Sequence, residues 1–260
     1  MVKLGLYGTL LAAGIATLGV FALGSESSSK SESPVATGPR RPVLLELFTS
    51  EGCSSCPPAD RLLERLDRSQ PVAGAWIIVL SEHVDYWNRL GWTDPFSSPL
   101  FSQRQQDYVN RLHLDSAYTP QLVVDGQKDV VGSDERAIRV AILKAETQAK
   151  ASIELKAQRA RAAASIEIEA RGASRGTRVY VALAEDHAQS QVTRGENAGR
   201  SLRHVAVVGS LLLAGKTDDE GAFAKHLTVP LGEADSGMRR VVVFLQDSDS
   251  RILGADEMRL

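Results

Sequence analysis

The first half of the chain carries two near-continuous apolar runs separated by a helical pattern. The runs at residues 43–48 and 76–81 are typical of strands that are covered on both faces of a sheet. Between them, leucines recur at helical spacing over residues 62–66, after Pro57-Pro58. Proline suits the first turn of a helix and disfavours the α region for the residue before it, so the helix is predicted to begin at Pro57. This stretch predicts a βαβ unit with parallel strands.

An aromatic-rich segment follows at residues 84–115. Ser98-Pro99 is a suitable N-cap and first-turn pair, and the apolar spacing after it predicts a helix that ends near Leu112. We interpret the segment as a helical insertion whose aromatic side chains form a core. The alternative is an aromatic wall that contacts a substrate.

A hairpin and a helix complete this half of the chain. Residues 122–126 predict a short strand that ends in a turn, and residues 129–132 predict its antiparallel partner. Ser133 is the expected N-cap of a helix that runs to about Ala149. This order of elements is the thioredoxin topology, so residues 43–150 are predicted to form an α/β thioredoxin-like domain with a helical insertion.

The second half of the chain changes to a period of two. Residues 152–157, 164–171 and 178–184 alternate apolar and polar positions, and further β-like runs follow. Short strands separated by turn signals predict a C-terminal antiparallel β-sandwich-like domain over residues 151–260. The Gly-rich polar loop at residues 194–204 is predicted to be an ordinary surface connection, with a binding loop as the alternative.

The N-terminus has the pattern of an export signal. Lys3 precedes an uncharged apolar run at residues 4–23, and small residues allow cleavage after Gly24. Residues 1–24 are therefore predicted to be a signal peptide, with an uncleaved membrane anchor as the alternative. Residues 25–42 are rich in Ser, Pro and charge, which is typical of a flexible linker. We expect the rest of the chain to be exported, periplasmic or secreted, with membrane contact only through such an anchor.

Composition and net charge bear on one class of partner, nucleic acid. The chain is 43% apolar and 24% charged, which is ordinary for a globular protein. Its formal net charge is −2, and it has no long basic block. Nothing in it favours nucleic acid as a partner.

The candidate chemistry lies between the first predicted strand and helix. Cys53 and Cys56 are the only cysteines in the chain, and they form a C-x-x-C motif directly before the helix. A strand that leads through this motif into a helix is the layout of a redox site. Cys53 is the predicted nucleophile, because the N–H groups of Ser55 and Cys56 are available to point at its sulfur and the helix dipole is expected to lower its pKa. Cys56 is the predicted resolving residue.

Several residues are expected to lie near this pair. His83 and Asp85 follow the second strand, and the carboxyl ends of parallel strands meet at one edge of a sheet. Trp87 is a further candidate neighbour. Thr119 and Pro120 precede the third strand, where the thioredoxin fold carries a cis proline beside its cysteines. Pro120 is therefore predicted to shape the substrate groove.

Three functions are compatible with these residues. A disulfide that closes so short a loop contributes only about 2 kcal/mol in the loop-entropy model, which argues against a structural role. The leading hypothesis is a thiol–disulfide oxidoreductase without a cofactor, acting on a protein or small thiol or disulfide and served by a redox partner. A copper-binding protein using Cys53, Cys56 and His83 is the first alternative, since thiolates and imidazole suit copper. A non-catalytic binding module with a structural disulfide is the second.

Three segments of the chain stand out as a series of distinctive motifs: LLELFTSEGCSSCPPAD, HVDYWNRLGWTDPFSSPLFSQRQQDY and YTPQLVVDG…VVGSD. They resemble successive motifs of the domain of unknown function (DUF) 1223 family. NAGRSLRH followed by VAVVGSL is similar to the C-terminal part of the family. The resemblance covers roughly Val43 to the C-terminus. It implies a secreted bacterial protein with a thioredoxin-like fold, and it implies no activity.

Overall fold

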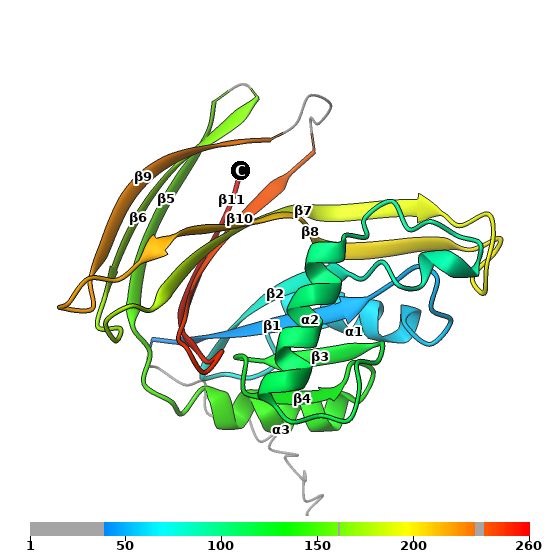
Figure 1. The fold of residues 1–260 in the computed structure, drawn as a ribbon, viewed down its shortest axis with the longest axis horizontal. Helices are drawn as coiled ribbons and strands as arrows, with labels where there is room; N and C mark the ends of the chain where they lie inside the picture. The colour runs from blue at the N-terminus through cyan, green and yellow to red at the C-terminus, as the bar shows by residue number, and fades with distance from the viewer. Residues whose placement is uncertain (1–38, 161, 232–236) are drawn as a thin grey trace, which may run out of the picture. The chain divides into compact units, whose positions relative to one another are not determined.

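The computed structural model describes residues 39–160, 162–231 and 237–260, which belong to one compact unit (Figure 1). The predicted signal peptide or anchor, and the predicted linker up to residue 38, lie outside the described residues. Within the described part, no helix has the length and apolar character needed to cross a bilayer.

A mixed sheet of eight strands forms the body of the protein. Its order is β11-β10-β7-β8-β2-β1-β3-β4, and a second sheet has the order β5-β6-β9. The strands of the large sheet are β1 (Arg41–Thr49), β2 (Ala75–His83), β3 (Gln121–Val124), β4 (Lys128–Val131), β7 (Arg178–Gln191), β8 (Ser201–Lys216), β10 (Arg239–Gln246) and β11 (Ile252–Arg259). Those of the small sheet are β5 (Ser152–Ala160), β6 (Ala163–Arg171) and β9 (Phe223–Pro230).

The helices of the described residues are short and begin close to their predicted positions. They are α1 (Pro57–Ser69), the 3₁₀ turn η1 (Asn88–Leu90), α2 (Pro99–Arg111) and α3 (Glu135–Ala145). Ser98 caps α2 as predicted, because its hydroxyl accepts the N–H of Leu100. The predicted cap of α3 is wrong by one residue. Asp134, rather than Ser133, accepts the N–H of Ala137 at 2.9 Å.

Strand β1 is buried on both faces, and its side chains alternate between two cores. Val43, Leu45 and Leu47 pack with the apolar side chains of α1 and α3. Leu44 and Phe48 point to the other face, which α2 crosses in Figure 1. A strand covered on both sides explains why the sequence shows a continuous apolar run there.

The predicted fold class, a thioredoxin-like domain followed by a β-sandwich-like domain, is wrong. The β1–α1–β2 unit is parallel, as predicted, but strands from both halves of the chain join one sheet. The junction is the parallel pairing of β2 with β8, in which Ser81 lies opposite Val207. Strands β7, β10 and β11 then continue the sheet, and only β5, β6 and β9 form a separate one. The sequence pattern identified strands, but alternation carries no information about which strand pairs with the open edge of β2.

A buried ion pair also connects the two halves. Arg240 on β10 is fully buried, and its guanidinium binds both carboxylate oxygens of Asp67 on α1, at 2.8 and 3.0 Å. The same guanidinium reaches Asp186 on β7 at 3.0 Å and Glu257 on β11 at 3.1 Å. Arginine suits this position, because its planar guanidinium group can bind several carboxylates at once.

Candidate functional site

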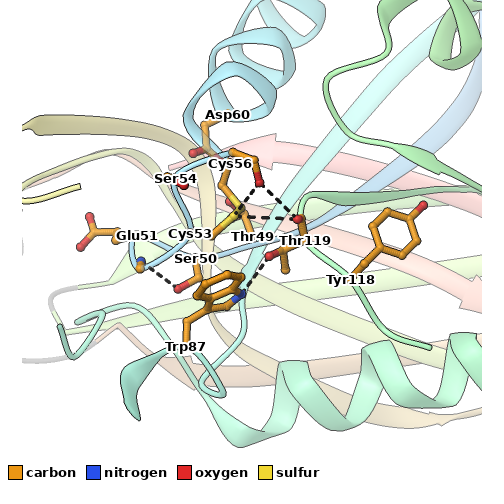
Figure 2. The surroundings of a disulfide bond; sticks show 12 residues. Thr49, Ser50, Glu51, Cys53, Ser54, Cys56, Asp60, Trp87, Tyr118 and Thr119 are labelled. Atoms are coloured by element: carbon orange, nitrogen blue, oxygen red, sulfur yellow. Dashed lines mark hydrogen bonds between the residues drawn. A yellow bond between two sulfur atoms is a disulfide. The ribbon is translucent and has the colours of Figure 1, made fainter. Parts of the chain in front are cut away.

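A disulfide between Cys53 and Cys56 lies at the junction of β1 and α1 (Figure 2), with the two Cα atoms 5.5 Å apart. Both cysteines are fully buried, whereas Ser54 and Ser55 between them are exposed. The sulfur of Cys53 lies 3.3 Å from the hydroxyl oxygen of Ser55 and 3.9 Å from the carbonyl oxygen of Thr119. The pair is therefore enclosed by protein while its connecting loop faces solvent.

Cys56 is the N-cap of α1. Its carbonyl accepts the N–H groups of Ala59 and Asp60, at 2.8 and 3.1 Å. Its backbone is nevertheless in the α region, although Pro57 follows and disfavours this conformation. The N–H of Cys56 donates to the carbonyl of Cys53 at 3.2 Å, so the prediction that it points at the Cys53 sulfur is wrong. The positive end of the helix dipole still meets the cysteine loop at Cys56.

Thr119, Pro120 and Trp87 lie beside this loop. The peptide bond between Thr119 and Pro120 is cis. The indole N–H of Trp87 donates to the Thr119 hydroxyl at 2.9 Å, as Figure 2 shows. A Cβ atom added to Gly52 would lie 3.0 Å from the Trp87 Cβ, so Trp87 packs against the backbone directly before Cys53. The structure thus brings these predicted site residues together around Cys53.

The two other predicted neighbours have no hydrogen bond to either cysteine among the described residues, although Asp94, the partner of His83, also accepts the N–H of Glu51 at 2.9 Å. His83 lies opposite Thr49 in the sheet, and its Nδ1 is 2.7 Å from the carboxylate of Asp94. Burial alone would raise the pKa of Asp94, but His83 and two backbone N–H donors lower it below its usual value. Asp85 accepts the hydroxyl of Ser102 on α2 at 2.5 Å.

The copper alternative remains a prediction. Among residues 39–260 as far as they are described, no three His, Cys, Asp or Glu side chains are grouped as a metal site requires. Cys53 and Cys56 are bonded to each other, and only their reduced thiolates would be metal ligands.

Sequence reasoning missed the contribution of the loop at residues 194–200, which connects β7 to β8. Asn197 is fully buried, and its side-chain amide donates to the carbonyls of Glu51 and Cys53, at 2.8 and 2.9 Å. Glu196 accepts the N–H of Ser54 at 3.0 Å. The prediction of an ordinary surface connection is therefore wrong. This 194–200 loop holds the cysteine loop in place.

Sequence reasoning also missed His204 on β8. Its ring is buried, with Nε2 3.2 Å from a carboxylate oxygen of Glu51 and Nδ1 3.7 Å from one of Asp60. Burial alone would lower the pKa of His204, but the carboxylates of Asp60 and Glu51 raise it to about 10, so the ring is cationic at neutral pH. The only sequence signal is one histidine before the apolar run at 205–208.

Glu51 and Asp60 flank the cysteine loop on its two sides. Glu51 precedes Cys53, and its carboxylate also accepts the indole N–H of Trp92 at 2.9 Å. Asp60 follows Cys56 by one turn of α1 and accepts the hydroxyl of Thr49 at 2.9 Å. His204 therefore connects the turn before the disulfide with the helix after it.

The fold and the site define a mixed α/β protein with one C-x-x-C disulfide at a strand–helix junction. Residues 44–246 match the family described as protein of unknown function (DUF1223), and the chain belongs to this family. The resemblance noted in its motifs is thereby confirmed. A crystal structure of a protein from Agrobacterium tumefaciens is similar, with 26% identity and a TM-score of 0.64 over 86% of this chain and 95% of that one. A search of curated proteins finds no match.

Proposed function

We propose that this protein is a thiol–disulfide oxidoreductase that acts through Cys53 and Cys56. The observation that supports the proposal is the position of the disulfide, which spans three positions of sequence and ends on the N-cap of α1. So short a loop adds only about 2 kcal/mol of stability through the unfolded chain. The end of a helix, in contrast, favours a thiolate and therefore favours exchange.

The exchange needs no cofactor. In the reduced protein, the Cys53 thiolate attacks one sulfur of a substrate disulfide, and the other substrate sulfur leaves as a thiolate and takes a proton from solvent. The Cys56 thiolate then attacks the Cys53 sulfur of the mixed disulfide, which re-forms the Cys53–Cys56 bond and releases the second substrate thiol. Two electrons pass to the substrate, and oxidation of a dithiol is the reverse sequence.

The surroundings of Cys53 support its role as the attacking residue. The Ser55 hydroxyl, 3.3 Å from its sulfur, is placed to donate a hydrogen bond to a thiolate. The cis Thr119-Pro120 peptide and Trp87 border the same side and would form the wall along which a substrate binds. The substrate would be a protein or small thiol or disulfide, a second redox protein would restore the pair, and an exported location would allow the disulfide to persist.

The reduction potential of the Cys53–Cys56 couple tests this function. Equilibration with thiol buffers is expected to give a value of roughly −120 to −270 mV, the range of exchange enzymes. A value below about −300 mV would describe an inert structural disulfide and would contradict the proposal. Alkylation of the reduced protein across pH should also show a Cys53 pKa below the value of about 8.5 for a free thiol.

A further inference from the structure

A cavity of about 290 Å³ lies between α1, from the residue that follows Cys56, and the beginning of β8. Pro57, Asp60, Arg61 and Glu64 line it from one face of α1, and residues 201–203 line it from β8. Its volume is close to the lower end of the range of about 300–1,000 Å³ that small-molecule sites occupy. Its size therefore suits a small molecule or the end of a peptide.

Both walls of the cavity lead directly to the cysteine loop. Pro57 follows Cys56, and Figure 2 shows Asp60 one turn further along the same helix. On the other side, residue 201 follows the 194–200 loop, whose Asn197 binds the carbonyl of Cys53. The cavity is therefore lined by residues that directly follow, along the chain, Cys56 on one side and the 194–200 loop on the other.

Two arginines give the cavity its charge. Arg61 and Arg203 are exposed, and within the described residues neither side chain forms a hydrogen bond or an ion pair. The two carboxylates of the cavity already have cationic neighbours. Asp60 lies 3.7 Å from His204, and Glu64 lies 3.9 Å from Arg68. His204 also contacts Glu51, so Asp60, Glu64 and Glu51 together with His204, Arg68, Arg61 and Arg203 leave one net positive charge, which the two exposed guanidinium groups present to the cavity.

We propose that this cavity binds the carboxylate group of the substrate, and that the substrate is a small or peptide disulfide bearing negative charge. Guanidinium forks bind carboxylates in two-point geometry, and Pro57 and Leu202 supply apolar surface for the chain between carboxylate and sulfur. Because both cysteines are buried, a local opening of the cysteine loop must expose the Cys53 sulfur before it meets the substrate sulfur. This inference rests on the proposed exchange activity and specifies the substrate class.

Three disulfides of similar length and different charge test it. They are the anionic 3,3′-dithiodipropionate, the neutral bis(2-hydroxyethyl) disulfide and the cationic cystamine. The reduced wild-type protein should react with them in that order of kcat/KM, with the anion favoured over the neutral compound by about tenfold. The double variant Arg61→Ala, Arg203→Ala should lose this preference and keep its rate with the neutral compound. Arg65→Ala is the matched control, because Arg65 lies on α1 but pairs with Glu135 at 3.0 Å.

The two proposals fail in different ways. If the neutral compound reacts but wild type and the double variant show the same charge preference, the carboxylate site is wrong and the exchange activity stands. If no disulfide reacts, the exchange activity is wrong. Calorimetry with suberate, the all-carbon analogue of dithiodipropionate, then tests whether the cavity binds a carboxylate, independently of any exchange reaction. Saturable binding that the double variant loses supports the anion site, and no difference between the two proteins overturns it.

Discussion

The side-chain amide of Asn197 donates a hydrogen bond to the carbonyl oxygen of Cys53 at 2.9 Å. The donor belongs to the loop between β7 and β8, and the acceptor belongs to the junction of β1 and α1. A residue from the second half of the chain therefore fixes the backbone of the cysteine motif.

Asn197→Ala should make the disulfide easier to reduce. The variant leaves the carbonyls of Glu51 and Cys53 without the amide, which should cost about 1–2 kcal/mol and favour local opening of the loop. Reduction by dithiothreitol, followed by thiol labelling, should be about five to thirty times faster than in wild type. Arg194→Ala, an exposed position in the same loop, should keep the wild-type rate. Equal rates for all three proteins would show that the amide does not protect the disulfide.

Replacing each cysteine separately should distinguish nucleophile from resolving residue. Cys56→Ser keeps the Cys53 thiolate but cannot release the mixed disulfide, so an adduct with bis(2-hydroxyethyl) disulfide should accumulate. Cys53→Ser should form the adduct much more slowly. Intact-mass spectrometry over time measures both. Faster modification of Cys56 would reverse the assigned roles.

His204 should make stability depend on alkaline pH. Its folded-state pKa of about 10 is above the usual 6.5, so folding favours the protonated ring. This contribution is fully present below about pH 6.5 and is lost as pH rises through about 10. His204→Gln should therefore cost about 3 kcal/mol near neutral pH, and less as pH approaches 10. Urea midpoints across pH measure this difference, with His226→Gln, an exposed histidine on β9, as the control. A constant difference across pH would contradict the assigned charge.

Arg240→Ala should be strongly destabilising. It would leave Asp67, Asp186 and Glu257 close together without the buried guanidinium, a loss of about 3–5 kcal/mol. Urea unfolding monitored by circular dichroism gives the free energy of unfolding. Arg251→Ala is a suitable control, because this arginine is half-exposed and binds only its neighbour Asp247. A loss below about 1 kcal/mol would mean that the carboxylates adjust without their partner.

The sequence predicted correctly those features that depend on residues close together in the chain. Continuous apolar runs identified β1 and β2, Pro57 marked the start of α1, and spacing alone singled out Cys53 and Cys56. Each of these features is decided within one element or one turn. The fold class failed because it depends on the partner of β2, which lies more than a hundred residues away.

The site residues that sequence reasoning missed, Asn197 and His204, also depend on the pairing of β2 with β8. Asn197 and His204 reach the cysteine loop only because β8 pairs with β2 and brings the 194–200 loop with it. Neither residue belongs to a motif with a known spacing to C-x-x-C. The apolar run at residues 205–208 was the one local hint, since a strand apolar on both faces requires cover on both sides.

The pairing of Ser81 with Val207 also sets an order of assembly. During synthesis, Cys53 and Cys56 emerge long before the strand that completes their surroundings. Until β8 docks, neither Asn197 nor His204 is in place, so the cysteine loop lacks the two side chains that hold its backbone and its flanking carboxylates. The enclosure of the cysteine motif therefore depends on a strand that lies more than a hundred residues further along the chain.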